Sequence, residues 1–421
     1  MRYLFYHTTF REKRENKMKI FRIFPGLLVL CLLLSLFPPC ALALDGPELT
    51  AQAVLLADLD SGAVLYEQNS DVQRSPASLT KIMTVLLALE AVERGEISLE
   101  DPVTAGPSCR SGMREDSSSV GIVSGETMSL RDLLYCAAVA SGNDACNVIA
   151  VYVAGDIPSF VLRMNRKAES LGCTQTHFVD PHGLSYDDLT CARDLFRITL
   201  EAMSHPGFME LCDCPAVTVA ATNKSPARNL KNSNALISTE GIYGDRYLYE
   251  GAHGVKTGYT RAAGYCLIST AERNGMRLLA VVLGSDGPYL SNTDVRYSFV
   301  DSARLYDWAF GLFRPRELCA AGQVLSDQRV SPAWGDPNLP LLAEEPLTVL
   351  LPDGAEPELC LELEDAALRA PIAAGQLLGW AVFLYEGEEL GRTALVAGRS
   401  IDRNIWAYVV RTVKETTETG V

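Results

Sequence analysis

Residues 79–89 are apolar around nearly the whole circumference of a helix, and this run constrains the fold more than any other feature of the chain. Its apolar positions are Leu79, Ile82, Met83, Val85, Leu86, Leu87 and Leu89. A helix that is apolar on every side lies in the interior of a protein. Ser75 suits the N-cap of this helix, Pro76 its first position, and Gly95 its end. We therefore predict a helix that is surrounded by the rest of a large domain.

Ser78 and Lys81 lie three residues apart at the start of this predicted helix. Residues i and i+3 share a helix face, so the Lys81 amine can reach the Ser78 hydroxyl. A lysine in the interior needs a partner or a lowered pKa, and a helix N-terminus stabilises a developing oxyanion. This is the arrangement of a nucleophile and its base. The S-x-x-K pattern alone is too common to exclude a surface serine beside a solvent-exposed lysine.

The size and charge of the chain restrict its classes of function. With 421 residues, the chain has room for two or three domains. Its formal net charge of −15 argues against a nucleic-acid partner. We therefore expect an enzyme or binding protein whose ligand is neither DNA nor RNA.

The N-terminus has the organisation of an export signal. Residues 18–22 form a basic segment, residues 26–37 an apolar core, and a signal-peptidase site ends at Ala43. The apolar core is too short to span a membrane comfortably. Met18 begins a well-formed signal and is an alternative start of translation. We predict that residues 1–43 are removed and that the protein is exported to the outer face of the cytoplasmic membrane or the cell-wall space.

The cysteines are unusual for an exported protein. Ten of the twelve follow the predicted signal, and this even number would allow disulfide bonds. Several lie in apolar or small-residue segments, where free cysteine packs as a small apolar side chain: Cys136, Cys146, Cys191 and Cys266. Cys212 and Cys214 lack a second pair at metal-binding spacing. We expect buried, mostly reduced thiols and no metal site.

Strand and helix patterns indicate an α+β region up to about residue 313. Residues 51–67 form a predicted hairpin, and three consecutive antiparallel strands follow from residue 254. Helices are predicted at residues 129–140, 144–153, 160–171, 190–203 and 293–313. We expect the last helix to pack on the antiparallel sheet.

The C-terminal part of the chain has a different pattern, and Arg314-Pro315 marks the predicted boundary. Residues 316–398 contain short strands and turns without a Ser/His/Asp cluster, which indicates a small all-β domain. In the tail, residues 399–421, apolar side chains recur at helical spacing at Ile401, Ile405, Val409 and Val413. This amphipathic helix could lie on a membrane surface or pack on its own domain, and the sequence favours neither.

Two further triplets accompany Ser78 and Lys81. The chain contains S-x-x-K, S-x-N and K-T-G once each and in this order; the second and third are Ser141-Gly142-Asn143, between two predicted helices, and Lys256-Thr257-Gly258, on a predicted strand. Each triplet alone is a weak signal. Together, each in a suitable structural context, they indicate one active site.

With these triplets, the chain resembles the penicillin-binding serine acyltransferase superfamily, and within it the D-alanyl-D-alanine carboxypeptidases of the low-molecular-mass penicillin-binding proteins. The resemblance covers residues 52–313 and includes the blocks "SPASLTKIMTVLLALE", "ASGNDACN" and "GVKTGYTRAAGYCLISTAERNGMRLLAVVLG". It implies a catalytic domain over residues 44–313, in which helices flank an antiparallel sheet and form a helical subdomain. It also implies peptidoglycan stem peptides ending in D-Ala-D-Ala as substrate, β-lactams as inhibitors, and no cofactor or metal.

The resemblance implies a role for each motif residue. Ser78 would attack the carbonyl between the two D-alanines, and Lys81 would accept its proton. Ser141 would relay this proton to the departing D-alanine. The Asn143 amide would hold the peptide backbone of the substrate, and Lys256 would add positive charge.

The remaining assignments concern the carboxylate and the oxyanion. The Thr257 hydroxyl would bind the terminal carboxylate, and Gly258 would leave space for a strand-like ligand. Backbone N–H groups of Ser78 and Tyr259 would form the oxyanion hole. Arg296 is a weaker candidate for a second carboxylate contact, with a surface salt bridge as the alternative.

Two alternatives to a carboxypeptidase share these triplets. A serine β-lactamase would need a glutamate in an E-x-x-L-N loop, and no such loop lies between Ser141 and Lys256. A catalytically silent wall-binding protein could keep the fold, although every side chain that the chemistry requires is present. Stable binding of penicillin, as opposed to its turnover, separates a carboxypeptidase from a β-lactamase.

Overall fold

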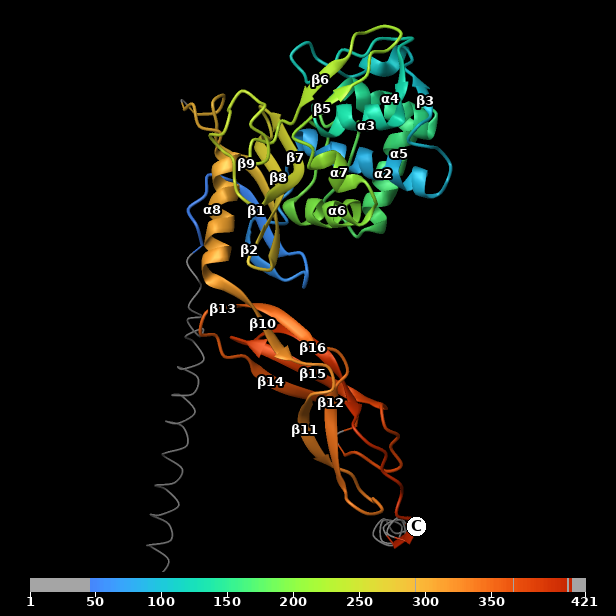
Figure 1. Ribbon diagram of the computed structural model, residues 1–421, viewed down its shortest axis with the longest axis vertical. Helices are drawn as coiled ribbons and strands as arrows, with labels where there is room; N and C mark the ends of the chain where they lie inside the picture. The colour runs from blue at the N-terminus through green and yellow to red at the C-terminus, as the bar shows by residue number, and fades with distance from the viewer. Residues whose placement is uncertain (1–45, 292, 366, 407–408, 411–421) are drawn as a thin grey trace, which may run out of the picture. The chain divides into compact units, whose positions relative to one another are not determined.

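A five-stranded antiparallel sheet organises the α+β part of the chain. The computed structural model describes residues 46–291, 293–365, 367–406 and 409–410 (Figure 1). The strand order is β2-β1-β9-β8-β7. The strands are β1 (Ala53–Asp58), β2 (Val64–Gln68), β7 (Ala252–Thr260), β8 (Gly264–Arg273) and β9 (Met276–Ser285). The predicted N-terminal hairpin and the three later strands are confirmed, and pairing of β1 with β9 joins them into one sheet.

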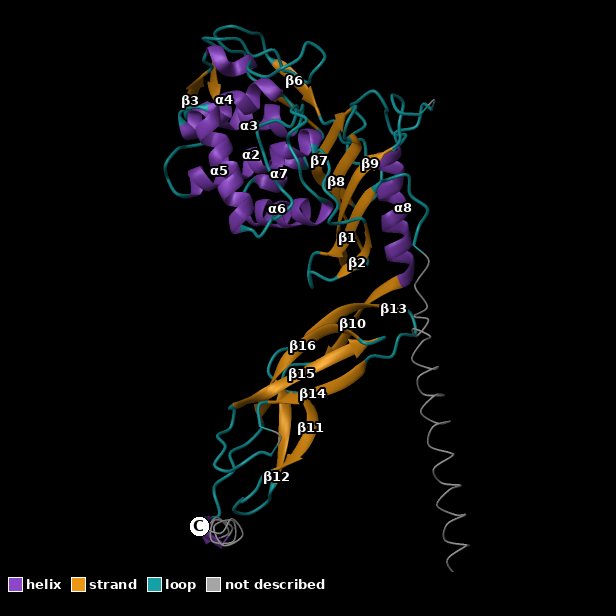
Figure 2. Cartoon of the chain, turned by 180° about the vertical axis from the view of Figure 1, so that it is seen from behind, coloured by secondary structure: helices purple, strands orange, loops and turns teal. Residues whose placement is uncertain are grey.

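The two faces of this sheet are buried by different helices. On one face, helix α8 (Tyr297–Leu312) packs its Leu305 and Tyr306 against side chains that include Val54 and Leu56. The alternate residues of the same strands, such as Leu55 and Val281, belong to the core shared with the helical subdomain. Residue alternation along a strand therefore builds two cores from one sheet, as Figure 2 shows for the layers.

Helix α2 (Lys81–Glu93) lies at the centre of the helical subdomain, as its apolar circumference predicts. It contacts the helices that surround it, which are α3 (Leu130–Ala138), α4 (Asn143–Ala154), α5 (Ile157–Ser170), α6 (Ala192–Ser204) and α7 (Phe208–Cys212). Ten of its thirteen residues are buried. Two short hairpins complete this region, β3 (Pro102–Thr104) with β4 (Thr127–Ser129) and β5 (Ala216–Val219) with β6 (Arg228–Lys231).

The start of the central helix differs from the prediction. A 3-10 turn, η1 (Ala77–Thr80), precedes α2, its N-cap is Pro76, and Ser75 does not cap it. Ala77 has φ of +48°, which a continuous α-helix excludes. Ser78 therefore lies in the 3-10 turn, while Lys81 is the first residue of α2.

The next helices follow the predicted signals more closely. The Ser129 hydroxyl caps α3 by accepting a hydrogen bond from the Asp132 N–H at 3.1 Å. Helix α3 ends at Ala138, and Asn143 is the first residue of α4, so the S-x-N triplet spans the loop and the start of a helix.

The C-terminal strands form a sheet with a core of its own. Its order is β11-β12-β16-β15-β14, from β11 (Val324–Arg329), β12 (Asn338–Ala343), β16 (Glu388–Ala397), β15 (Leu377–Tyr385) and β14 (Glu358–Leu363). Leu339, Leu341 and Leu395 are fully buried in this core. A separate pair joins β10 (Phe313–Cys319) to β13 (Leu347–Pro352), so Arg314-Pro315 lies within a strand.

Two predictions concern segments at the ends of the chain. The predicted signal, residues 1–43, lies outside the described residues. In the tail, Ile401 is buried and exchanges two 2.9 Å backbone hydrogen bonds with Ile372, so its place on an amphipathic helix was wrong. Ile405 and Val409 are helical and exposed, and Val413 lies outside the described residues.

No single helix and no cysteine of the described residues has the features of a membrane-spanning or disulfide-bonded segment. Within the described residues, no single helix is long and apolar enough to cross a membrane; α4 and α5 meet the criterion only together and are bent by 85°. The cysteines from Cys109 to Cys360 are free thiols, and all but Cys214 and Cys360 are buried. Their burial agrees with the prediction.

Candidate active site

Ser78 and Lys81 are in direct contact. The Lys81 Nζ lies 2.8 Å from the Ser78 Oγ and donates a second 2.8 Å hydrogen bond to the His182 carbonyl. The Lys81 side chain is fully buried, and this burial lowers its pKa. A lysine with a lowered pKa can act as the general base for a hydroxyl that lies at hydrogen-bond distance from its amine.

A tight turn over residues 180–183 packs against η1, the 3-10 turn that carries Ser78, and holds it in place. Gly183 has φ of +84°, and a Cβ there would lie 1.8 Å from the Ala77 carbonyl oxygen. The Thr84 hydroxyl donates to the Pro181 carbonyl at 2.6 Å. Because no side chain fits at residue 183, the two turns pack backbone to backbone and fix both Ser78 and the acceptor of Lys81.

The second triplet lies between α3 and α4. Ser141 has φ of +59°, and the Gly142 N–H donates to the Cys136 carbonyl at 2.9 Å. Asn143 is buried, and its Oδ1 has no hydrogen-bond partner in the described part of the chain. A buried amide oxygen with no donor is costly, so Asn143 is suited to accept a hydrogen bond from a ligand N–H.

Asp144 was not recognised from the sequence, although it organises one wall of the site. Its fully buried carboxylate accepts hydrogen bonds from the Ser119 hydroxyl at 2.6 Å and the Ile122 N–H at 2.9 Å. The Asn143 N–H donates to the Ser118 carbonyl at 3.0 Å. These bonds tie the loop before β4 to the start of α4.

The third triplet lies on β7, the edge strand of the large sheet next to η1. A Cβ at Gly258 would lie 3.1 Å from the Pro76 carbonyl oxygen and 3.3 Å from the Ser78 nitrogen. The Thr257 hydroxyl lies 2.6 Å from that of Ser233, a second contact that no motif indicated. Gly258 therefore allows the strand to approach the nucleophile.

Lys256 is the second buried lysine of the site. Burial, followed by the nearby charge of Lys81, lowers the pKa of Lys256 to about 7. Its Nζ donates to the Thr257 carbonyl at 3.1 Å. Lys256 therefore changes its charge near neutral pH.

One cavity of about 680 Å³ connects the three triplets. Its lining includes Ser78, Ser141, Asn143, Thr257, Gly258, Tyr259 and Arg296. The Tyr259 ring stacks on Tyr265, with ring centroids 4.4 Å apart. The structure thus brings every sequence-predicted site residue to this cavity or, for Lys81 and Lys256, to direct contact with its lining residues.

Arg296 lies at the N-cap of α8. Its guanidinium packs over the rings of Tyr265 and Phe299 at 5.0 and 4.9 Å, and its Nε is buried without a partner. Among the described residues Arg296 makes no ion pair, which argues against the surface salt bridge and leaves its charge facing the cavity.

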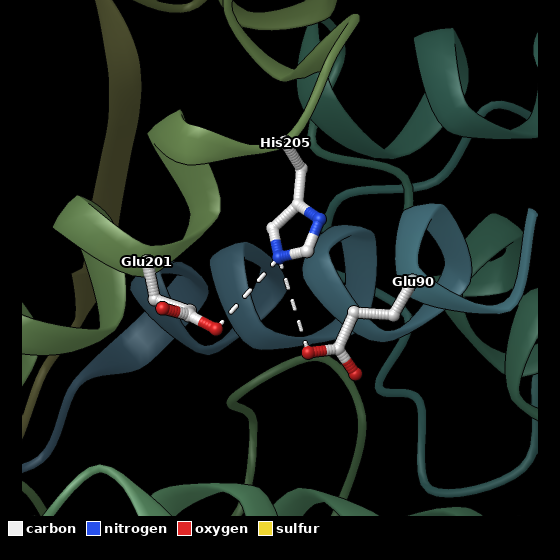
Figure 3. Close-up of side chains that lie close together, drawn as sticks. All are labelled: Glu90, Glu201 and His205. Atoms are coloured by element: carbon white, nitrogen blue, oxygen red, sulfur yellow. Dashed lines mark ion pairs between the residues drawn. The ribbon is translucent and has the colours of Figure 1, made fainter. Parts of the chain in front are cut away.

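Three side chains of types that can bind a metal ion lie together outside this cavity: Glu90 on α2, Glu201 on α6 and His205 at the end of α6. The His205 Nε2 lies 3.9 Å from Glu90 Oε1 and 3.8 Å from Glu201 Oε1 (Figure 3). The Lys167 ammonium donates to the same two oxygens at 2.6 and 2.5 Å. The lysine therefore already supplies the cation that the two carboxylates require.

The family of this chain follows from its similarity to known proteins. The model of the D-alanyl-D-alanine carboxypeptidase family matches residues 41–287, more than half of the chain. This chain belongs to the D-alanyl-D-alanine carboxypeptidase family. As in other members, its catalytic part is that of a serine peptidase, and the model of the C-terminal domain of penicillin-binding protein 5 matches residues 313–403.

Relatives of known function resemble the carboxypeptidase chain over most of its length. It is 32% identical to D-alanyl-D-alanine carboxypeptidase DacA of Haemophilus influenzae, over 87% of this chain and 91% of that protein. It is 30% identical to D-alanyl-D-alanine carboxypeptidase DacF of Bacillus subtilis, over 89% and 93%. The crystal structure of penicillin-binding protein 5 from Haemophilus influenzae superposes with a TM-score of 0.69 at 31% identity and covers 86% of this chain and all of that one.

Proposed function

We propose that this protein removes the terminal D-alanine from peptidoglycan stem peptides that end in D-Ala-D-Ala, through an acyl-enzyme on Ser78. The observation that carries the proposal is the 2.8 Å contact between Lys81 Nζ and Ser78 Oγ, beside a cavity lined by the other two triplets. Family membership supports the reaction class.

Acylation begins with proton transfer from the Ser78 hydroxyl to the neutral Lys81 amine. The Ser78 Oγ attacks the carbonyl carbon of the penultimate D-alanine, and the carbonyl oxygen becomes an oxyanion. Backbone N–H groups of Ser78 and Tyr259 stabilise this charge, by about 3 kcal/mol for each donor. Ser141 passes the proton from Lys81 to the departing amine, the C–N bond breaks, and D-alanine leaves.

Deacylation reverses these roles for a water molecule. Lys81 takes a proton from the water while its oxygen attacks the ester carbon on Ser78. The ester bond breaks, and the proton returns to the Ser78 oxygen. The shortened stem peptide is released and the Ser78 hydroxyl is regenerated, so one water is consumed for each D-alanine released.

Substrate binding uses the polar groups at the cavity wall. The unpartnered Asn143 Oδ1 accepts a hydrogen bond from the substrate backbone. The Thr257 hydroxyl and the charges of Lys256 and Arg296 bind the terminal carboxylate, because two cations and a hydroxyl donor there face one anion. The β7 edge lets an extended peptide lie beside Gly258.

β-Lactams acylate the same serine. Attack of the Ser78 Oγ on the lactam carbonyl breaks the C–N bond, but the amine stays tethered to the acyl group and cannot diffuse away. The related penicillin-binding protein D2 from Listeria monocytogenes, 31% identical with a TM-score of 0.52 over 63% of this chain and 99% of that one, was crystallised in the ampicillin-bound form.

The proposed location is outside the cytoplasm. Residues 1–43 act as the export signal, with Met18 as the alternative start, ahead of a catalytic domain over 44–313 and a β domain over 316–398. In the tail over 399–421, apolar side chains contact the membrane surface: Ile405, Trp406, Val409 and Val410 are exposed. Sedimentation with anionic vesicles should fall when Ile405 and Trp406 are both changed to Ser, and equal sedimentation would contradict the contact.

The test of the proposed activity is release of D-alanine from a diacetylated L-Lys-D-Ala-D-Ala peptide, measured beside penicillin hydrolysis. The proposal predicts release that Ser78→Ala abolishes, with slow penicillin turnover. Rapid penicillin turnover without D-alanine release would favour a β-lactamase. Absence of both activities in a folded protein would favour the silent wall-binding alternative.

A further inference from the structure

Two neighbouring carboxyl groups, those of Asp180 and Asp188, lie at the turn whose His182 carbonyl accepts a hydrogen bond from Lys81. Asp188 is fully buried, and its Oδ1 accepts a 2.7 Å hydrogen bond from the Val179 N–H. Its Oδ2 is buried with no donor in the described part of the chain. Asp180 is its neighbour, and the Asp180 N–H lies 3.4 Å from Asp188 Oδ1.

Asp180, in contrast, accepts backbone hydrogen bonds on both carboxylate oxygens, and its Oδ2 accepts only one of them. Its Oδ1 accepts the N–H groups of His182 at 2.8 Å and Gly183 at 2.5 Å, and its Oδ2 accepts that of Ser185 at 2.8 Å. The His182 Nδ1 also lies 2.9 Å from Asp180 Oδ1. These bonds close the turn whose His182 carbonyl accepts the hydrogen bond from Lys81.

A fully buried carboxylate such as Asp188 does not easily ionise beside a second, half-buried carboxylate, because each charge raises the pKa of the other. Burial opposes ionisation of Asp180, but its hydrogen bonds and the nearby charge of His182 outweigh burial and hold its pKa well below the usual range. Burial and the charge of Asp180 raise the pKa of Asp188 to about 8. The proton is therefore expected on Asp188 Oδ2, because protonation lets this buried, unpartnered oxygen donate a hydrogen bond.

We propose that Asp188 is a neutral carboxylic acid that donates a hydrogen bond to the ionised Asp180, and that this pair is a positioning element for Lys81. The pair fixes the turn that carries the His182 carbonyl and leaves one negative charge, not two, beside the base. This inference rests on the proposed function, since it treats Lys81 as the base that activates Ser78.

The charges that surround Lys81 show why a second anion would matter. Helix α4 contributes the Asp144 carboxylate and the Cys146 thiol, which is neutral because burial raises its pKa to about 12. Strand β7 contributes Lys256, and the loop over residues 180–188 contributes the carboxyl pair. A further negative charge at Asp188 would favour the Lys81 ammonium, which cannot accept the Ser78 proton.

The test is the pH dependence of the acylation rate, measured with a chromogenic cephalosporin by stopped flow from pH 5 to 10. Asp188→Asn matches a neutral acid in shape and charge, so we expect a rate within about twofold at pH 7 and an unchanged acid limb below pH 8, where wild-type Asp188 keeps its proton. The double variant Asp180→Asn, Asp188→Asn removes the remaining charge, so its acid limb moves to lower pH by about one unit. A shift of that size in Asp188→Asn alone would overturn the proposal.

A second measurement does not depend on kinetics. A buried acid with a raised pKa holds its proton while the unfolded chain loses it, so wild-type stability falls between the unfolded pKa near 4 and the folded pKa of about 8. The melting temperature of Asp188→Asn should therefore gain on wild type as pH rises through this range, and a constant difference would contradict a protonated Asp188.

Three further outcomes complete the test. If Asp188→Asn did not fold, infrared spectra of wild type would replace it, and the lack of a carboxylic-acid carbonyl band at pH 7 would overturn the proposal. Absence of any acylation in folded wild type would contradict the proposed function. Normal wild-type acylation with a shifted Asp188→Asn profile would contradict the carboxyl pair alone.

Discussion

The Lys81 Nζ lies 2.8 Å from the Ser78 Oγ, although the two residues belong to different elements, an α-helix and the 3-10 turn before it. The i, i+3 spacing brings them together in either conformation. What the 3-10 turn adds is proximity to the β7 edge, where Gly258 approaches the backbone of Ser78. The contact thus joins the base, the nucleophile and the strand that aligns the substrate.

Replacement of the base tests its role directly. Lys81→Met keeps the length of the side chain and its apolar packing but removes the amine. We expect penicillin acylation to slow by about a thousandfold, since general-base catalysis contributes 10²–10⁴-fold. Stopped-flow acylation measures the effect, with circular dichroism to check folding. A folded variant that retains more than a tenth of the rate would contradict the assignment.

The two lysines predict opposite pH dependences. Burial lowers the pKa of Lys81, so kcat should rise with pH as the ammonium loses its proton, with a midpoint below the ordinary lysine value of about 10.4. The Lys256 ammonium, with a pKa of about 7, is charged below that pH and neutral above it. Its attraction for the substrate carboxylate is therefore lost as pH rises, and KM should increase above pH 7. A KM that stays constant from pH 6 to 9 would contradict this role.

Gly258 is required by space at the nucleophile. The Cβ of Gly258→Ala would meet the Pro76 carbonyl and the Ser78 nitrogen at 3.1 and 3.3 Å, which moves β7 away from the serine. We expect the acylation rate to fall by at least tenfold, because an increase of about 1.4 kcal/mol in the activation free energy is enough for that loss. Gly106→Ala, where a Cβ meets open space, is the matched control and should leave the rate unchanged. Equal rates for both variants would show that the strand tolerates the displacement.

Arg296 should act on the substrate carboxylate and not on the chemistry. We expect Arg296→Ala to raise KM about tenfold for a peptide with a free C-terminal carboxylate, while a C-terminal amide analogue is unaffected. Arg304→Ala, on the same helix and bonded to the Glu48 carbonyl, is the control. A similar loss with both peptides would assign Arg296 a structural role through its packing on Tyr265 and Phe299.

Lys167 should contribute to stability without affecting catalysis. Lys167→Met removes the ammonium that bridges Glu90 and Glu201 in a mostly buried site, although Arg94 still lies 3.5 Å from Glu90. Breaking such a pair typically costs about 3 kcal/mol, so the midpoint of urea unfolding should fall while penicillin acylation stays normal. Lys224→Met, on the exposed surface, is the control. An unchanged midpoint would mean that His205 or solvent replaces the lysine.

The elements with strong local patterns could be predicted from the sequence. The apolar run over residues 79–89 determines a buried helix because only the interior accommodates it, and alternation along the later strands determines the sheet. The Ser129 cap also follows from local chemistry, since its hydroxyl accepts a hydrogen bond from a residue three positions later.

Features that depend on distant contacts could not be predicted in this way. The 3-10 turn at Ser78 depends on Gly183, more than a hundred residues away. Ser233 lies in no motif, and Asp144 is not one of the triplet residues; only the fold brings them to Thr257 and to the wall of the cavity. Ile401 fits the helical spacing of the tail, but pairing with Ile372 overrides that pattern.

The most direct measurement of the central claim is mass spectrometry of the exported form after incubation with penicillin and proteolysis. The account predicts one penicilloyl adduct, on the peptide that contains Ser78, and no adduct in Ser78→Ala. An adduct on the peptide that contains Ser141, or labelling that persists in Ser78→Ala, would contradict it.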